Sequence, residues 1–419
     1  MNILSMQKAL RRARSEGGFC TLLGVGPMSP MVLQAALEIS SEQDFPILFI
    51  TSRNQVDKDE FGGGYVNGWD QLRFAQAIRD MADKISYRGQ YYLCRDHGGP
   101  WQRDEERRAR MPEKEAMERG LRSYYADIDA GFDLLHIDPT KEPGPPEGAV
   151  PMDRVLRRTV ELIARTEAYR RAQGKPPIGY EVGTEETNGG LTGAEAFEAF
   201  IRRLRTTLAE KGLPMPGFIV GQTGTLTRLT ENVGHYSFEN AIRLSRLSAE
   251  NGMELKQHNT DYLPEELLLA HPAMGVSSAN VAPEFGTVET RAYLLLDKVE
   301  RRLYELGLVG EATGLTPALQ RAAVNTGRWR KWMVDGKDRL TCEEVLSDAE
   351  LTRVVTDVAG HYTFETPEIA PVIRQLLDNL EKAQVPARRY VVDKIKEAIG
   401  RYVTCYNLRG LTSRLEKYQ

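Results

Sequence analysis

The sequence has few cysteines, and they lie far apart. Cys20, Cys94, Cys342 and Cys405 are the only four in the 419-residue chain, and no two of them form a Cys-x-x-Cys pair. This spacing excludes a zinc ribbon and provides no disulfide framework of the kind that stabilises small secreted domains. A reducing compartment fits this cysteine usage best, so we expect a cytoplasmic protein.

The sequence also lacks a long apolar run and an excess of charge of one sign. No segment approaches the roughly 20 apolar residues of a membrane-spanning helix, and residues 1–16 show no signal-peptide pattern. Basic and acidic residues are mixed, with a net charge of −4. We therefore expect neither a membrane nor a nucleic acid as partner. The basic groups 107–110 and 328–331 could hold an anion, although solvated helix faces are the simpler interpretation.

What the sequence does have is a regular alternation of apolar, strand-like segments with amphipathic, helix-like segments. The expected strands are 19–26, 46–52, 91–97, 134–138, 178–183, 218–222, 254–258 and 274–279. A helix-like segment follows each of them. Eight strand–helix units predict an α/β fold, specifically a (β/α)8 TIM barrel, and a doubly wound open sheet is the alternative.

The last part of the chain has a different pattern. Segments 313–326, 368–383 and 388–401 look helical, aromatic residues recur, and no strands alternate with these helices. We therefore expect a barrel domain over residues 1–306 and a C-terminal helical extension over residues 307–419. The extension could be a lid, a brace or an oligomer surface.

Polar side chains gather where the expected strands end. In parallel α/β folds, ligands bind at the carboxyl ends of the strands. The polar residues at these ends are Asn54, Gln55, Asp96, His97, His136, Asp138, Glu181, Glu185, Gln222, His258, Asp261 and Asn280. Polar groups at so many strand ends are costly to bury unless they bind something. The pattern predicts a ligand site at the mouth of the barrel.

His97 and His258 are the best candidates for metal ligands. Histidines with nearby carboxylates and amide oxygens suit Zn²⁺, Mn²⁺ or a similar divalent cation better than a thiolate site does. Gln222, or a carboxylate such as Glu185 or Asp138, would complete the ligand set. For either histidine alone, a hydrogen-bonded strand end is the simpler interpretation. Two histidines at equivalent strand ends favour the metal.

The remaining histidines and the glycine-rich segment lead to different expectations. His235 and His361 lie in loop-like sequence, and we expect both to face solvent. His271 precedes a proline, and we expect a structural role for it. Residues 62–64 are three glycines without the Lys-Ser/Thr of a phosphate loop, so we interpret them as a hinge near the mouth.

Five segments, in this order, resemble the motifs of one known family. They are Thr51-Ser-Arg-Asn-Gln-Val-Asp57 followed by Phe61-Gly-Gly-Gly-Tyr65, then Asp96-His-Gly-Gly-Pro-Trp-Gln102, His136-Ile-Asp138, Gly183-Thr-Glu185 and His258-Asn-Thr-Asp-Tyr262. The family is the Z-type, so-called non-catalytic, subunit of class II D-tagatose-1,6-bisphosphate aldolase. It also includes proteins that act as ketose or ketonate 4-epimerases. The resemblance covers essentially the whole chain.

The resemblance implies a class II aldolase-like barrel that uses a divalent metal. Zinc is the most expected cation, and manganese, nickel, cobalt or magnesium are alternatives. By matching motif positions, Asp96 would be a general acid/base, His97 and His258 would be metal ligands, and Gln222 would replace the strand-six ligand. One departure is the loop after His258, where Asp261 would repel a phosphate that the glycine-serine loop of catalytic aldolases binds.

These expectations combine into three functional hypotheses. The first is an enzyme that performs retro-aldol and aldol chemistry, either aldol cleavage or 4-epimerisation, on a ketose, a ketonate or a ketose phosphate. The second is a non-catalytic subunit that stabilises a separate class II aldolase chain, and the third is a metal-dependent sugar isomerase. For the enzyme we expect homo-oligomers or an aldolase partner. Its catalytic carboxylates would be Asp96, Glu185 and Asp138, and its substrate-binding residues would be Asn54, Gln55, Asp261, Asn280 and Glu181.

Overall fold

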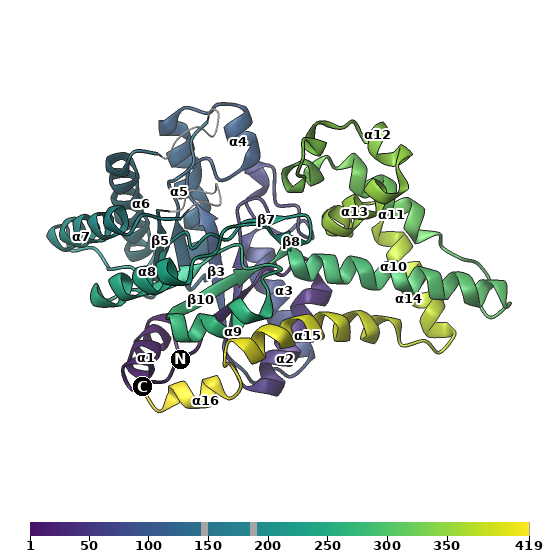
Figure 1. Cartoon of the computed structure of the whole chain (residues 1–419), viewed down its shortest axis with the longest axis horizontal. Helices are drawn as coiled ribbons and strands as arrows, with labels where there is room; N and C mark the ends of the chain where they lie inside the picture. The colour runs from purple at the N-terminus through teal and green to yellow at the C-terminus, as the bar shows by residue number, and fades with distance from the viewer. Residues whose placement is uncertain (144–149, 185–190, 419) are drawn as a thin grey trace.

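The computed structural model describes residues 1–143, 150–184 and 191–418. Within these ranges, eight parallel strands close into a barrel, in the ring order β1, β2, β3, β4, β5, β6, β9, β10 (Figure 1). The strands are β1 Leu22–Val25, β2 Ile47–Thr51, β3 Tyr91–Gly98, β4 Leu134–Ile137, β5 Gly179–Gly183, β6 Phe218–Val220, β9 Glu254–Gln257 and β10 Val276–Val281. The closed ring confirms the predicted barrel and excludes the open sheet.

Helices surround the barrel because each strand is buried on both faces and needs cover from outside. In β2, for example, all five residues are buried. The covering helices are α2 Pro30–Gln43, α3 Gln71–Lys84, α5 Glu113–Ala130, α6 Met152–Ala172, α7 Ala194–Glu210, α8 Phe238–Glu250, α9 Glu265–Met274 and α10 Pro283–Glu305. The sequence marks some helix starts clearly. Ser29 caps α2 through its hydroxyl, which accepts hydrogen bonds from the N–H groups of Met31 and Val32.

The amino-terminal end of the barrel is closed by helix α1, Ile3–Ser15. The side chains of Ile3 and Gln7 lie against Gly179 and Gly217, at the start of β5 and just before β6. The hydroxyl of Tyr92, near the start of β3, donates to the carbonyl of Met1 at 3.2 Å. A ligand therefore has its approach from the carboxyl ends of the strands.

Short helices and one hairpin lie in the loops at that carboxyl end. They are η1 Asp59–Phe61 after β2, α4 Asp104–Arg108 after β3, and the antiparallel hairpin β7 Thr227–Arg228 and β8 Glu231–Asn232 after β6. None of the described helices is long and apolar enough to cross a bilayer.

Buried ion pairs hold the loops after β2 and β3 together. Arg53, which is fully buried, pairs with Asp57 at 2.9 Å and with Glu106 at 2.9 Å. Arg95 on β3 pairs with Asp127 of α5 and donates to the carbonyls of Thr51 and Val56. Separating the partners of such a buried pair is costly because it leaves an uncompensated charge. The ion pairs therefore hold these loops of the mouth in place relative to the barrel.

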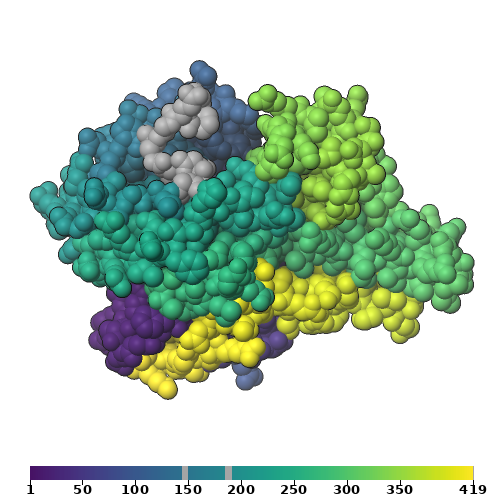
Figure 2. Space-filling view, viewed as in Figure 1, coloured from purple at the N-terminus to yellow at the C-terminus, as the bar shows by residue number. Residues whose placement is uncertain are grey.

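The C-terminal residues divide into two packing units. The elements are α11 Leu315–Asn325, η2 Arg328–Trp332, η3 Lys337–Arg339, α12 Cys342–Ser347, α13 Ala349–Ala359, η4 Gly360–Tyr362, α14 Ala370–Lys382, α15 Ala387–Cys405 and α16 Leu411–Glu416. Residues 315–362, which we call the cap, have a small core of their own around Trp329 and Val355. The cap stands beside the rim of the barrel, on the same side as α4 (Figures 1 and 2).

Helices α14 to α16 return to the barrel and share its main core. Helix α15 packs against α2 and α10, and α16 packs against α1. The predicted helical segments 313–326, 368–383 and 388–401 correspond to α11, α14 and α15. The division of the chain into two domains at residue 306 stays a prediction.

Candidate metal and catalytic site

A bulge in strand β3 turns two consecutive side chains toward the barrel mouth. The register between β3 and β4 shifts between Arg95 and Gly98, and His97 has a φ of 45°, a left-handed value that is uncommon for a residue other than glycine. In a regular strand, neighbouring side chains point to opposite faces. Here Asp96 contacts Asn280 of β10, and His97 contacts His258, which follows β9. The bulge therefore allows both residues of the Asp-His pair to enter one site.

Two carboxylates fix the orientations of the His97 and His258 rings. Nδ1 of His97 lies 2.7 Å from Oδ2 of Asp138, and Nε2 of His258 lies 2.8 Å from Oε1 of Glu181. Each of these contacts requires the proton to be on the histidine nitrogen, because an ionised carboxylate only accepts hydrogen bonds. The other nitrogen of each ring then has a lone pair. Carboxylates hold metal-ligating histidines in this way.

The two lone-pair nitrogens face each other. Nε2 of His97 and Nδ1 of His258 are 3.1 Å apart. Two such lone pairs repel unless a proton or a cation lies between the rings. Two nitrogen ligands at about 2.0–2.1 Å from one tetrahedral zinc ion would be roughly 3.3 Å apart. The observed spacing therefore fits two adjacent ligands of a divalent cation.

His136 of β4 is a third histidine in the same cluster. One nitrogen from each of His97, His136 and His258 lies within 4.8 Å of the others. Burial lowers the pKa of His136 to about 4, so its ring is neutral at pH 7. Its Nδ1 accepts the backbone N–H of His97 at 3.2 Å, which places the proton on Nε2, and this nitrogen has no partner among the described residues. In this orientation the ring is a donor, so His97 and His258 are the stronger pair of ligands, and His136 could join them after its ring rotates.

A buried lysine compensates the charge of Glu181. Nζ of Lys256 on β9 lies 2.6 Å from Oε2 of Glu181, and both side chains are almost completely buried. Burial alone would raise the pKa of Glu181, but Lys256 and the neighbouring histidines hold it well below its usual range. The carboxylate stays ionised, which the contact with His258 requires.

Asp96 is the carboxylate of the site that is most open to the mouth. Its side chain is 13% exposed, whereas that of Glu181 is 0% exposed. Oδ1 of Asp96 accepts from Nδ2 of Asn280 at 2.9 Å and lies 3.5 Å from Nε2 of His258. Oδ2 has no hydrogen-bond partner in the described part of the chain. Asp96 can therefore exchange a proton with a ligand that lies against the histidines.

Four other residues that were predicted to bind a ligand or take part in catalysis are Asn54, Gln55, Gln222 and Glu185. Asn54 bonds to the backbone of Gln102 and Asp104, and the side-chain oxygen of Gln55 accepts from the N–H of Ser52. Gln222 is buried near Thr225 after β6, and Glu185 lies outside the described residues. The predicted roles of these residues in ligand or substrate binding stay predictions.

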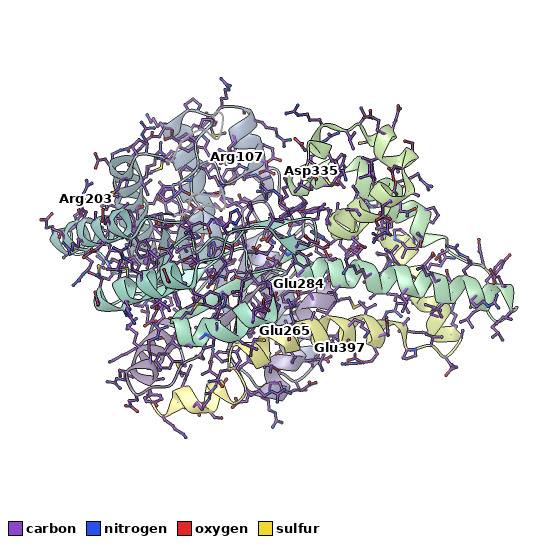
Figure 3. All side chains as sticks on the ribbon, viewed as in Figure 1. Arg107, Arg203, Glu265, Glu284, Asp335 and Glu397 are labelled. Carbon is purple, nitrogen blue, oxygen red and sulfur yellow. The ribbon has the colours of Figure 1, made fainter. Side chains whose placement is uncertain are left out.

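Asp261 has a structural position. Its Oδ1 accepts from the N–H groups of Ala282 and Glu284, at 3.0 and 2.9 Å, where helix α10 begins. Burial and the neighbouring carboxylate of Glu284 raise the pKa of Asp261 to about 7. Glu284, labelled in Figure 3 at the start of α10, bonds in turn to the hydroxyl of Tyr402 at 2.6 Å. The predicted contact of Asp261 with substrate stays a prediction.

Two residues of the cluster were not predicted from the sequence as part of the metal site, and the exposure of one other histidine was predicted wrongly. Sequence reasoning did not propose His136 as a ligand or Lys256 as part of the site, although the alternation of His136 and Asp138 on one strand was a usable signal. The expectation that His361 faces solvent is wrong, because its side chain is buried, with 3% exposure. His235 is exposed as expected, and His271 is buried in α9 and bonded to Gln257.

Comparisons with known proteins show the family of the chain. The family model described as D-tagatose-1,6-bisphosphate aldolase subunit GatZ/KbaZ-like matches residues 6–399. The D-tagatose-1,6-bisphosphate aldolase subunit GatZ of Klebsiella oxytoca is 25% identical over 392 residues, which cover 88% of this chain and 86% of the relative.

Solved structures support the fold. A probable tagatose 6 phosphate kinase from Sinorhizobium meliloti aligns with a TM-score of 0.75 and 21% identity, over 92% of this chain and 100% of that one. The fructuronate-tagaturonate epimerase UxaE of Cohnella laeviribosi aligns with a TM-score of 0.57 and 11% identity, over 93% of this chain and 81% of that one. Because the family model spans nearly the whole sequence, the chain belongs to the GatZ/KbaZ-like family of D-tagatose-1,6-bisphosphate aldolase subunits.

Proposed function

We propose that this chain is a metal-dependent carbohydrate enzyme that performs retro-aldol and aldol chemistry on a ketose, a ketonate or a ketose phosphate. The observation that supports this most is the pair of nitrogens of His97 and His258 that face each other at 3.1 Å, each ring held from behind by a carboxylate. A chain that served only as a brace would have no need to bury this costly arrangement.

His97 and His258 would hold the cation, and His136 or Gln222 would complete the set. A divalent cation, with zinc as the first candidate, would act there as a Lewis acid on the carbonyl and adjacent hydroxyl of a ketose. Asp138 and Glu181 would keep the two rings in the required tautomer.

Asp96 would accept and return the proton of the C4 hydroxyl of the substrate. Its free oxygen accepts the proton of the C4 hydroxyl, and Asn280 holds the other oxygen in place. The C3–C4 bond then breaks, its electron pair remains on the C2–C3 unit as an enediolate, and C4 becomes an aldehyde. Release of both halves would be aldol cleavage. Rotation of the aldehyde, followed by bond formation and return of the proton from Asp96, would be 4-epimerisation.

An assay of the purified chain tests this proposal. The protein, treated with EDTA and then supplied with Zn²⁺, Mn²⁺, Ni²⁺, Co²⁺ or Mg²⁺, is incubated with ketoses, ketonates and ketose phosphates. We expect metal-dependent cleavage or epimerisation, which His97→Ala abolishes and His235→Ala, on the exposed histidine, does not. Asp138→Asn should weaken metal binding by roughly 10–100-fold.

The alternative is a non-catalytic subunit of a class II aldolase, and the word subunit in the names of the family and of its Klebsiella relative favours it. This alternative predicts no turnover with any metal, together with stabilisation of a separate aldolase chain. Incorporation of deuterium at C1 or C2 with an intact C3–C4 bond would instead indicate the isomerase hypothesis.

A further inference from the structure

A cluster of cations and aromatic rings lies where the cap meets the barrel. Arg328 and Lys331 belong to η2 of the cap, Tyr362 belongs to η4, and Tyr65 belongs to the loop after β2. The guanidinium carbon of Arg328 is 4.6 Å from the ring centre of Tyr65 and 5.3 Å from that of Tyr362. Nζ of Lys331 is 5.6 Å from the ring centre of Tyr362. We call these four residues the cap cluster.

The two cations of the cap cluster have no carboxylate partner. Among the described residues, no Asp or Glu forms an ion pair with Arg328 or Lys331, whereas the buried arginines Arg53, Arg95 and Arg158 each have at least one carboxylate partner. Lys331 is exposed and Arg328 is half-buried, and the aromatic rings supply only a weak attraction to the two cations. The cap cluster therefore has positive charge that no described carboxylate pairs with.

A buried histidine beside the cluster has hydrogen-bonding capacity to spare. His361 is 3% exposed, and neither of its ring nitrogens has a partner among the described residues. Its ring centre is 4.1 Å from that of Tyr362. Burial and the charges of Lys331 and Arg328 lower the pKa of His361 to about 3. The ring is therefore neutral at pH 7, and the local field favours an incoming negative charge.

The cap cluster and the adjacent residue Trp332 contact two loops at the carboxyl end of the barrel. The N–H of Tyr65 donates to the carbonyl of Asn54 at 3.1 Å, and Asn54 lies three residues after the end of β2. On the other side, the N–H of Leu229 in the hairpin after β6 donates to the carbonyl of Trp332 at 2.9 Å. Asn232 of that hairpin donates to the carbonyl of Asn259, the residue after His258. The cap cluster and its neighbour Trp332 are thus joined by backbone hydrogen bonds to the loops after β2 and β6, at the carboxyl end of the barrel.

We infer that the cap cluster binds the anionic group of the substrate while the histidines of the barrel bind its ketose end. This inference rests on the proposed function and specifies which residues would bind the phosphate or carboxylate of a ketose phosphate or ketonate, on the end remote from the reacting carbons. Arg328 and Lys331 supply charge-assisted hydrogen bonds to the anion. The cap is then part of the binding site and determines substrate specificity.

Binding measurements on metal-free full-length protein test this without any need for turnover. Isothermal titration calorimetry would compare D-fructose 6-phosphate, the ketonate D-fructuronate and D-fructose as probes. We expect the anionic probes to bind at least tenfold more tightly than D-fructose, since a hydrogen bond to a charged group contributes about a factor of ten or more. Whichever anionic probe binds more tightly identifies phosphate or carboxylate as the ligand.

Variants test whether the preference for anionic probes comes from the cap cluster. Arg328→Gln combined with Lys331→Gln should remove the preference for anionic probes, and Arg328→Lys, which keeps the charge, should retain part of it. Lys337→Gln is the matched control, because it removes one positive charge from the neighbouring helix η3 and should leave the preference unchanged. Thermal melting checks that each variant is folded.

The outcomes separate this inference from the proposed function. A preference for anions that the double variant abolishes and His97→Ala preserves supports the cap cluster, even if no metal-dependent turnover is found. Equal binding of anionic and neutral probes, or a preference that the double variant keeps, overturns the inference, even if the chain proves to be an active aldolase or epimerase.

Discussion

Replacement of Lys256 by methionine should destabilise the protein by about 3–5 kcal/mol, the usual cost of breaking one buried ion pair. The ammonium group lies 2.6 Å from Glu181, and the two side chains are 1% and 0% exposed. Methionine fills a similar volume, so the main loss is the partner of a buried carboxylate. The charge of Glu181 then has only histidines nearby among the described residues, His258 at 2.8 Å and His136 at 3.7 Å.

Urea denaturation followed by circular dichroism measures the effect as a lower midpoint at an unchanged m-value. A double-mutant cycle with Glu181→Gln separates the pair from the rest of the fold. Because the second substitution removes the uncompensated charge, the double variant should be more stable than the sum of the single effects predicts, by about 1–3 kcal/mol. Lys298→Met, on an exposed lysine of α10, should change stability by less than about 0.5 kcal/mol.

A Lys256→Met variant whose free energy of unfolding stays within about 1 kcal/mol of the wild type would contradict a stabilising ion pair with Glu181. Additive effects of the two single substitutions would contradict it as well, since the ionised carboxylate of Glu181 would then not be stabilised by Lys256.

Two further predictions concern groups outside the catalytic cluster. Burial raises the pKa of Glu289 from 4.5 to about 7. Between these values the folded state binds the proton that the unfolded state has lost, so this group should reduce stability by roughly 3 kcal/mol as pH rises from 4.5 to 7. Glu289→Gln should remove that dependence, and stability curves of both proteins that run parallel across this range would contradict the assignment. Gly286→Ala would place a Cβ 2.7 Å from Cγ of His361, so it should destabilise by about 1–3 kcal/mol in chemical denaturation, whereas Gly310→Ala, which meets nothing within 4 Å, should not.

The barrel could be predicted from the sequence because its strands are short apolar segments that end in polar residues. The predicted strand 46–52 matches β2 to within a residue at each end. The last strand was predicted two residues too early, at 274–279 instead of Val276–Val281. Met274 is apolar, but it ends helix α9, and Gly275 with a φ of 80° makes the turn into the strand. Apolar character alone cannot assign a residue at such a boundary.

The candidate site was predictable only in part. His97 and His258 follow from their positions at strand ends, and the structure brings them together. The bulge that turns His97 inward depends on pairing between β3 and β4, which has no signature in the sequence of one strand. Glu181 is fully buried and bonded to His258, a contact that sequence alone does not reveal because burial depends on the tilt and register of the strands. Its predicted contact with substrate stays a prediction.

The wrong expectation for His361 has a similar cause. The residue lies in loop-like sequence, and its burial results from the packing of η4 against α10, where Gly286 leaves room for the ring. Contacts between segments about 75 residues apart cannot be inferred from local pattern.

The central claim is that His97 and His258 share one divalent cation. A crystal of the protein grown with zinc, measured at energies on both sides of the zinc absorption edge, tests it most directly. The account predicts an anomalous peak at about 2.0–2.1 Å from Nε2 of His97 and from Nδ1 of His258. The absence of a peak there, with the two nitrogens still about 3 Å apart and bridged by a proton, would contradict it.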